Sequence, residues 1–247
     1  MLSAKKLNKK FGSLVVAEDI SLSLPKGVRY ALIGPNGAGK TTLINLITGQ
    51  LRPDAGRILL NGEDVTHAPV AARVRRGLTR TFQINTLFPD LTPIEAVTLA
   101  ICERDRVAGQ FWRNLAAHGP AIDEGFAILR QLRLADAAAR PTRTLAYGQQ
   151  RLLEIALALA TRPRVLLLDE PAAGVPKDES AALFEVIAGL PSDISVLFIE
   201  HDMDIVFAFA TRIIVLVAGA VLLEADPATV RSDPRVREVY LGQAAHG

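Results

Sequence analysis

The chain has 247 residues, of which 49% are apolar, so it can bury the core of one large domain and is not a disordered protein. Its 28 lysines and arginines nearly balance its 26 aspartates and glutamates, and the formal charge of +2 argues against nucleic acid as its main partner. The single cysteine, Cys102, excludes an internal disulfide, a cysteine metal cluster and a redox pair, and indicates a reducing compartment.

A mean hydropathy of +0.24 makes a membrane span the first alternative to test. One of the longest apolar runs, Ile213 to Leu223, has only eleven residues, whereas a spanning helix needs about 20. The first residues, Met-Leu-Ser-Ala-Lys-Lys, lack the apolar stretch and the cleavage site of a signal peptide. We therefore expect a cytosolic chain whose apolar excess forms a core or partner interfaces.

The first third of the chain predicts strands, a glycine-rich turn and a helix. Ile20 to Leu24 alternates apolar and polar residues, as a half-buried strand does. Tyr30 to Ile33 is continuously apolar and indicates a strand buried on both faces. A helix is expected from Thr42 to Thr48, and Arg57 to Leu60 followed by Asn61-Gly62 predicts a hairpin.

The remainder predicts a helical region followed by alternating strands and helices. Residues 93–160 are rich in Ala, Leu, Arg and Glu and indicate several helices. Strands are then expected at Val165 to Leu168, Ser195 to Ile199 and Ile213 to Val217, with helices at Glu179 to Ile187 and Met203 to Ala210. This order predicts an α/β core with a mainly parallel sheet, interrupted by a helical insertion.

A phosphate-binding pattern, G-x-x-x-x-G-K-[ST], lies between the Tyr30 strand and the following helix. Its glycines allow backbone N–H groups to approach phosphate oxygens, and the helix directs its positive N-terminus at the same anion. Lys40 supplies a cation for the β- and γ-phosphates, and the Thr41 hydroxyl can ligate Mg²⁺. The strand and helix around the pattern disfavour a chance glycine-rich turn. The predicted cradle consists of Gly34, Pro35, Asn36, Gly37, Ala38, Gly39, Lys40 and Thr41.

Two acids, Asp169 and Glu170, end the apolar run that begins at Val165. A buried parallel strand delivers such residues to the ligand edge of its sheet, where Asp169 can bind Mg²⁺ and Glu170 can deprotonate an attacking water. By itself the pattern is equally well explained by a helix cap. The phosphate-binding pattern in the same chain favours the nucleotide site.

Two further motifs carry a family resemblance: Leu145-Ala-Tyr-Gly-Gln149, and Glu200-His201-Asp202 after an apolar strand. With them, the sequence from Phe11 to about Gly242 resembles the ATP-binding subunits of ABC transporters, and is most similar to those of branched-chain amino acid uptake systems. The resemblance implies a P-loop NTPase core with a mainly parallel sheet, an N-terminal antiparallel β subdomain and an inserted helical subdomain. Residues 1–247 would form a single ABC ATPase domain, with a core at 1–90 and 160–247 and the insertion at about 91–159.

In that family a signature, usually L-S-G-G-Q, contacts ATP bound to the other subunit. The resemblance assigns this role to Ala146, Tyr147, Gly148 and Gln149, although Ala146 replaces the usual serine and Tyr147 the first glycine. What remains physically is the N-terminus of a helix with its free N–H groups. Taken alone, the motif is better explained as a helix start with a glycine turn.

The resemblance assigns four further positions. His201 would lie beside the γ-phosphate and orient Glu170, and Gln83 would contact Mg²⁺ and the water. Phe11 would stack on adenine, although a phenylalanine in the core of the first hairpin is the alternative. Thr42 would touch the α-phosphate. The predicted catalytic residues are thus Glu170, His201, Lys40 and Gln83, and the predicted metal ligands are Thr41, Gln83 and Asp169. Pro176 stands where most of the family has an acid that contacts the partner subunit.

The function implied is the ATP-hydrolysing motor of an ABC importer that uses ATP and Mg²⁺, with branched-chain amino acids or related small polar solutes as cargo. Expected partners are a second ATP-binding subunit, identical or related, two membrane permease subunits that dock near Ile84 to Val97, and indirectly a periplasmic solute-binding protein. The chain would be peripheral, at the cytoplasmic face of the bacterial inner membrane. The alternative is a soluble non-transport ABC-type ATPase. A basic cluster, formed by Arg73, Arg75, Arg76 and Arg80, is expected to contact a partner or the membrane surface rather than nucleic acid.

Overall fold

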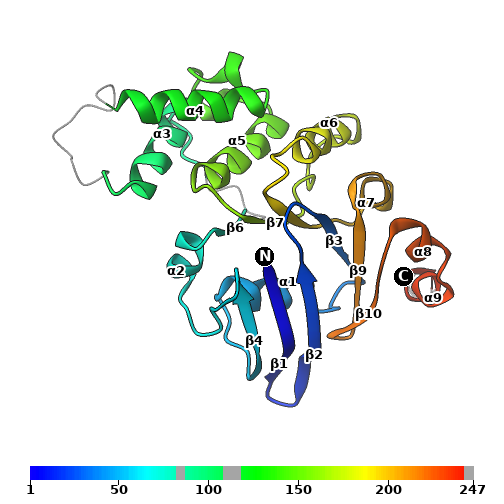
Figure 1. The fold of residues 1–247 in the computed structure, drawn as a ribbon. Coiled ribbons are helices and arrows are strands. Elements are labelled where there is room, and N and C mark those ends of the chain that lie inside the picture. Colours follow the sequence, from blue (N-terminus) through cyan, green and yellow to red (C-terminus); the bar gives the residue numbers. More distant parts are fainter. Residues whose placement is uncertain (82–86, 108–117, 242–247) are drawn as a thin grey trace.

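The computed structural model describes residues 1–81, 87–107 and 118–241. Two β-sheets and a group of helices form the fold (Figure 1). The strands are β1 Leu2–Phe11, β2 Leu14–Leu24, β3 Arg29–Ile33, β4 Ala55–Leu60, β5 Glu63–Asp64, β6 Leu78–Arg80, β7 Val165–Asp169, β8 Ser195–Ile199, β9 Arg212–Val217 and β10 Ala220–Ala225. The helices are α1 Lys40–Thr48, α2 Val70–Arg75, α3 Pro93–Arg104, α4 Gly119–Gln131, α5 Tyr147–Ala160, α6 Lys177–Ala188, α7 Met203–Phe209, α8 Pro227–Ser232 and α9 Pro234–Leu241.

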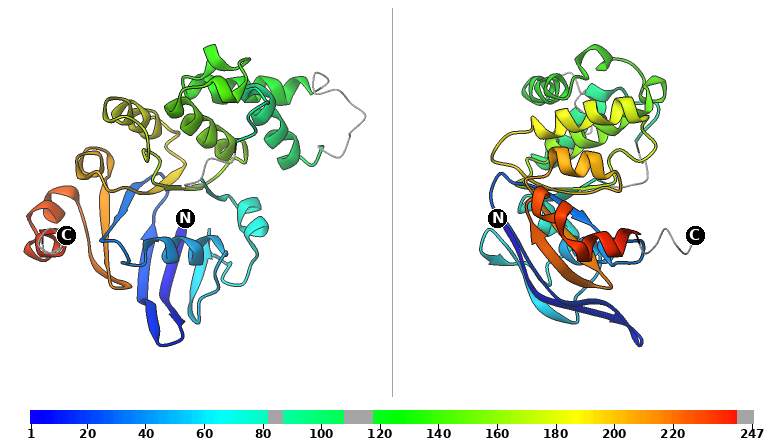
Figure 2. Two further views of the ribbon diagram at one scale, coloured as in Figure 1. Left: turned by 180° about the vertical axis from the view of Figure 1, so that it is seen from behind. Right: turned by 90° about the vertical axis from the view of Figure 1, so that its right-hand side faces the viewer.

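The first sheet, called here the N-terminal sheet, is antiparallel with the order β2-β1-β4-β5. The predicted hairpin after β4 is present, and Asn61 and Gly62 form its turn with φ angles of 53° and 86°. Two consecutive positive φ angles are typical of a type I′ turn, whose twist matches that of the flanking strands. The β1–β2 hairpin projects at the end of the molecule opposite α4 (Figures 1 and 2).

The second sheet, called here the central sheet, has the order β10-β9-β3-β8-β7-β6. Strands β9, β3, β8, β7 and β6 are parallel, and β10 adds an antiparallel edge. The predicted mainly parallel sheet is therefore confirmed. Because β3, β7 and β8 are parallel, their carboxyl ends share one edge, which brings together the loops that follow Ile33, Asp169 and Ile199.

Each face of the central sheet is covered by its own apolar cluster. On β3, Tyr30 and Leu32 pack toward α1 and the N-terminal sheet, whereas Ala31 and Ile33 pack toward the helices. Residues Tyr30 to Ile33 are at most 5% exposed. Burial on both faces explains why this strand is continuously apolar in sequence.

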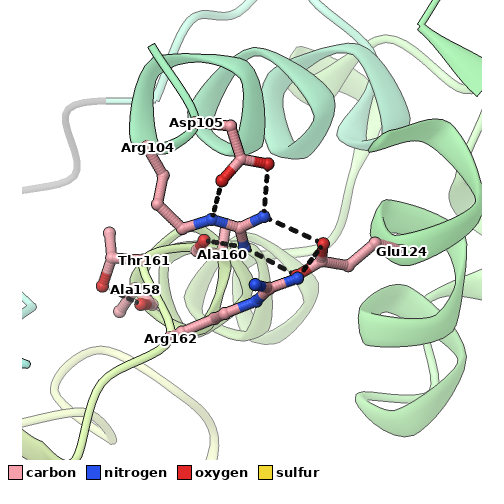
Figure 3. Close-up of polar contacts among 7 residues, drawn as sticks. All are labelled: Arg104, Asp105, Glu124, Ala158, Ala160, Thr161 and Arg162. Atoms are coloured by element: carbon pink, nitrogen blue, oxygen red, sulfur yellow. Dashed lines mark hydrogen bonds and ion pairs between the residues drawn. The ribbon is translucent and has the colours of Figure 1, made fainter. Parts of the chain in front are cut away.

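Helices α3, α4 and α5 form a lobe at one end of the molecule (Figure 1). Polar contacts join their ends, because Glu124 on α4 accepts hydrogen bonds from both Arg104 on α3 and Arg162, which follows α5 (Figure 3). Arg104 also donates to the carbonyl of Ala160 in the last turn of α5, at 2.9 Å. One carboxylate and two guanidinium groups thus hold the three helices together.

The expected surface role of the basic cluster is wrong for two of its members. Arg73 is 1% exposed, and its guanidinium donates to the carbonyls of Leu46, Ile47, Thr66 and Ala68. The side chain of Arg80 is 10% exposed and forms an ion pair with Asp169. Both arginines satisfy buried oxygens of this chain, so neither is available to a partner.

The apolar run from Ile213 to Leu223 is divided between two paired strands, β9 and β10, by a turn at Ala218 and Gly219. Within the ranges that the structure describes, every helix is too short or too polar to cross a bilayer.

Candidate nucleotide site

The loop from Gly34 to Gly39 connects β3 to α1, and two of its glycines are required by close packing. A Cβ on Gly34 would lie 2.1 Å from the carbonyl oxygen of Leu216, and one on Gly39 would lie 2.7 Å from that of Val16. Gly39 also has φ 98° as it leads into α1. Glycine is thus the residue that lets this loop turn tightly against β9 and β2.

Lys40, the first residue of α1, points back into the loop. Its Nζ donates hydrogen bonds to the carbonyls of Gly34 and Pro35, at 2.6 and 3.0 Å. Burial lowers the pKa of the Lys40 ammonium, while the nearby Glu170 and Asp169 oppose that shift. The site therefore holds a positive charge that a phosphate can pair with once the ammonium leaves the loop carbonyls.

A cavity of about 240 Å³ opens beside the loop and unites residues from four parts of the sequence. Glu170 and His201 belong to its lining. The remaining lining residues are Val16, Asn36, Gly37, Ala38, Gly39, Lys40, Thr41 and Thr42. Most of the predicted cradle therefore lines one cavity with the predicted general base.

Asp169 lies at the carboxyl end of β7, and its side chain is 6% exposed. Its Oδ2 accepts a hydrogen bond from Nη2 of Arg80 at 2.6 Å. The same guanidinium donates to Asn45 and Gln50. A buried carboxylate requires a cation beside it, and in this structure Arg80 supplies that charge.

Glu170 and His201 contact each other directly. Nε2 of His201 lies 2.6 Å from Oε1 of Glu170. Glu200, which is 6% exposed, fixes the backbone around the pair by accepting hydrogen bonds from the N–H groups of Ala172 and His201. Burial raises the pKa of the Glu200 carboxyl. The geometry places an imidazole where it can orient the carboxylate of Glu170.

The signature residues lie at the start of α5, apart from this cavity. Ala146 is the N-cap, and its N–H donates to Oε1 of Gln149 at 3.2 Å. The hydroxyl of Tyr147 accepts a hydrogen bond from Arg151, and a Cβ on Gly174 would lie 3.0 Å from the Tyr147 ring. Tyr147 thus packs on the loop that follows Glu170, while Ala146, Tyr147, Gly148 and Gln149 are absent from the lining of their own chain's cavity.

Four other predicted residues, Gly34, Pro35, Phe11 and Asp169, do not appear in the described lining of the cavity. Phe11 ends β1 and is 52% exposed, which excludes the alternative of a buried hairpin core. Gln83 lies outside the described residues.

Sequence reasoning missed three residues that support the site: Arg80, Glu200 and Tyr240. Burial raises the pKa of Tyr240 to about 12, and a hydrogen bond to the backbone of Gly34 opposes part of that shift. Tyr240 lies on α9, far from Gly34 in sequence, so no local pattern could reveal the contact. Glu200 had a signal, because it lies next to His201 directly after an apolar strand, whereas nothing in the sequence distinguishes Arg80 from a solvated arginine.

Comparisons with known proteins agree with this geometry. A family model described as ABC transporter matches residues 17–173, and one described as branched-chain amino acid ATP-binding cassette transporter matches residues 220–246. The chain is 38% identical over 253 residues to the high-affinity branched-chain amino acid transport ATP-binding protein BraF of Pseudomonas aeruginosa, covering 99% of this chain and 98% of BraF. It is 37% identical to the corresponding protein LivG of Escherichia coli K12, with the same coverage.

Solved structures give the same result. The ADP conformation of an ATP-binding cassette from an ABC transporter superposes with a TM-score of 0.86 at 32% identity, covering 98% of each chain. A nucleotide-free cassette superposes with a TM-score of 0.85 at 32% identity, covering 97% of this chain and 98% of that one. The predicted fold class is confirmed by both.

Proposed function

Since this chain belongs to the ABC transporter family of ATP-binding proteins, we propose that it is the ATP-hydrolysing motor subunit of an importer for branched-chain amino acids or related small polar solutes. One observation carries the proposal: the phosphate-binding loop, Glu170 and His201 line a single cavity. A cradle for phosphates next to a carboxylate base is the arrangement that hydrolysis of a nucleoside triphosphate requires.

The proposed chemistry follows from the contacts. The loop N–H groups and Lys40 hold the phosphates, and Thr42 contacts the α-phosphate. Glu170 accepts the proton of the attacking water, and His201 keeps the carboxylate in place through their 2.6 Å contact. Phe11, half exposed at the end of β1, offers a ring on which adenine can stack. Gln83 completes the proposed catalytic set.

A magnesium ion is also part of the proposal. Asp169 and Thr41 offer hard oxygen ligands, and the Asp169 carboxylate already requires a positive neighbour, which Arg80 provides. We assign Mg²⁺ to Thr41, Asp169 and Gln83. When bound, the ion would neutralise charge on the β- and γ-phosphates.

A second ATP-binding subunit, identical or related, is part of the proposal. The signature residues 146–149 do not line the cavity of their own chain. A second subunit facing the first could present its signature helix to this cavity, so that two nucleotides are enclosed between the pair. Pro176, which lacks an acidic side chain, would then make a weaker contact across the interface than the usual acid.

We propose that the chain transmits force to two membrane permease subunits. Leu87, Phe88 and Leu91 line an apolar cavity of about 280 Å³ on the helical lobe, and Phe88 is 69% exposed. Such a surface suits a cytoplasmic helix of a permease. Residues 84–86 of the expected docking segment lie outside the described residues. We further propose a core at 1–90 and 160–247 with the helical insertion at about 91–159, and a peripheral position at the cytoplasmic face of the bacterial inner membrane.

The cargo is proposed from the relatives. BraF and LivG are named as branched-chain amino acid transport proteins, and they align over nearly the whole chain. Their names favour transport over a soluble non-transport ATPase. A periplasmic solute-binding protein would deliver the cargo. Neighbouring genes for such a protein and for two permeases would support this assignment, and genes for unrelated functions would oppose it.

The hydrolytic role is tested with Glu170→Gln. The amide has the shape of the carboxylate but cannot accept the water's proton, so ATP turnover should fall by about two orders of magnitude or more. ATP binding should persist. Phosphate release measures the first effect, and calorimetric titration with ATP measures the second.

The matched control is Glu185→Gln on α6, whose carboxylate is 60% exposed. It should leave both measurements unchanged. A Glu170→Gln protein that hydrolyses ATP at the normal rate would show that Glu170 is not the base. A wild-type chain that binds no ATP would contradict the proposed function as a whole.

A further inference from the structure

A second cavity, of about 510 Å³, lies at the amino-terminal edge of the central sheet. Its walls are the β4–β5 turn, the end of α2, the end of α3 and the residues that lead into β7. The nucleotide site is at the opposite, carboxyl-terminal edge. We refer to this second site as the arginine cavity.

Positive charge dominates the lining of the arginine cavity. Five arginines reach it, against two carboxylates, those of Glu63 and Asp105. The arginines are Arg75, Arg76, Arg104, Arg162 and Arg164. Like charges gathered in one concave site repel each other, and an anion in the site relieves that repulsion.

Three of the five arginines are held in place by acids. Arg76 pairs with Glu63 at 2.9 Å. Arg104 is held by Asp105 and Glu124, and Arg162 by Glu124, so that one side of the cavity is a fixed array of guanidinium groups (Figure 3). These ion pairs fix the positions of the three guanidinium groups, but the paired carboxylates also neutralise their positive charge.

The other two, Arg75 and Arg164, are exposed at the arginine cavity, and the side chain of neither forms a hydrogen bond or ion pair with any residue within the ranges described. Arg164 also contributes to a lowered pKa of the Met1 ammonium, whose main cause is burial. That ammonium donates to Asn61, which lines the same cavity. The unpaired positive charge of the lining is therefore carried by Arg75 and Arg164.

The lining also indicates the ligand's chemistry. A guanidinium presents parallel N–H groups that match two oxygens of one phosphate. Among the described residues that line the cavity, none has an aromatic ring on which a base could stack, and Leu60 is the one large aliphatic side chain. Its volume exceeds what a single small anion fills. These features favour an anion with more than one phosphate or acidic group and without a large apolar part in the cavity.

We propose that the arginine cavity binds a phosphate-bearing polyanion, held by Arg75 and Arg164 against the wall formed by Arg104 and Arg162. Two sources share this chemistry: the headgroup of an anionic phospholipid and a soluble polyphosphate. The site contains none of the residues assigned to ATP hydrolysis, so its occupation is independent of the proposed motor function.

The first arm of the test uses sodium tripolyphosphate as the probe, in calorimetric titrations without magnesium. All variants in this arm also carry Lys40→Ala, which weakens phosphate binding at the nucleotide site. Differences in binding between the variants then report on the arginine cavity. Arg75→Gln with Arg164→Gln should weaken binding at least tenfold. Glu63→Gln, which releases Arg76 from its acid, should strengthen binding.

The second arm measures sedimentation of the full chain with vesicles of phosphatidylglycerol and phosphatidylcholine, against vesicles of phosphatidylcholine alone. The control, Arg52→Gln with Arg130→Gln, removes the same charge from exposed arginines outside the cavity. If the Arg75 and Arg164 variant alone loses binding to tripolyphosphate, the ligand is a soluble polyphosphate. If it alone loses binding to phosphatidylglycerol vesicles, the ligand is a lipid headgroup. Equal binding by this variant and the control in both arms would overturn the proposal.

Discussion

Arg80 and Asp169 form an ion pair that is buried on both sides, with side chains 10% and 6% exposed. Removing one partner of such a pair leaves an uncompensated charge in a medium of low polarity, which costs about 3–5 kcal/mol. Asp169 is also the proposed magnesium ligand. Arg80 and a bound cation can therefore neutralise the same carboxylate in different states of the protein.

Arg80→Met keeps an unbranched, flexible side chain but removes the positive charge and the guanidinium donors. The nucleotide-free protein should lose about 3 kcal/mol of stability, and the loss should shrink when magnesium and ADP are added. Thermal unfolding with and without both ligands measures the difference. Arg76→Met is the control, because its pair with Glu63 is 44% and 67% exposed and should contribute less than about 1 kcal/mol. An Arg80→Met protein as stable as the wild type without nucleotide would refute the argument.

Sequence patterns singled out the candidate site residues that belong to local motifs. The cradle, Glu170 and His201 could be found because each lies directly after a strand within a short recognisable string. Arg80 and Arg73 could not be placed, because a charged residue in sequence looks the same whether it is solvated or paired with buried oxygens. Only the packing of α1, β6 and β7 decides between the two.

Helix α1 follows the proposed phosphate-binding loop, and the side chain of Arg73 donates to carbonyls at its C-terminal end. Arg73 donates to the carbonyls of Leu46 and Ile47 in the last turn of α1, and to those of Thr66 and Ala68. The last carbonyls of a helix lack partners within the helix, so a buried end requires a donor from elsewhere. Arg73 fills this need and attaches α1 to α2.

Arg73→Lys should therefore lower the free energy of unfolding, by about 2–4 kcal/mol. The positive charge is retained, but one ammonium cannot reach carbonyls that a planar guanidinium spans in several directions. Urea denaturation measures the change. Arg75→Lys, two residues away and exposed, should change stability by less than about 0.5 kcal/mol. Similar midpoints for the two variants would show that Arg73 contributes only its charge.

The elements themselves were largely predictable. Strand β3 and helix α1 have strong local signals, a continuous apolar run and a glycine turn, and they lie where the sequence places them. The run from Ile213 to Leu223 shows the limit, because its length says nothing of the turn at Gly219 that folds it into β9 and β10. Whether an apolar run forms one element or two paired strands depends on which strands pair. The periodicity of a single sequence does not reveal that pairing.

At the scale of the whole molecule, the nucleotide site depends on both sheets. Val16 of β2 contributes to the cavity, while Glu170 and His201 come from the ends of β7 and β8. A ligand that contacts all of these should stabilise the entire domain, because it binds only the folded state. The order of the strands in each sheet could not be obtained from composition or periodicity, because it depends on pairing between segments far apart in the sequence.

Saturation with magnesium and ADP at about 100 times the dissociation constant should add about 2.7 kcal/mol of stability, which corresponds to roughly 5–10 °C in Tm for a chain of this size. Lys40→Ala should lose most of this shift. Lys26→Ala, an exposed lysine in the turn before β3, should keep it. The same ligand-induced shift in both variants would place the phosphates elsewhere.

Strand β3 has one further consequence for how the protein is made. It pairs on one side with β8 and on the other with β9, both of which are encoded in the last quarter of the chain. During translation, β3 therefore has no strand paired to either of its edges until more than four-fifths of the polypeptide has left the ribosome. We therefore expect that the ribosome-bound chain does not bind nucleotide. We also expect chaperones to bind its exposed apolar strand.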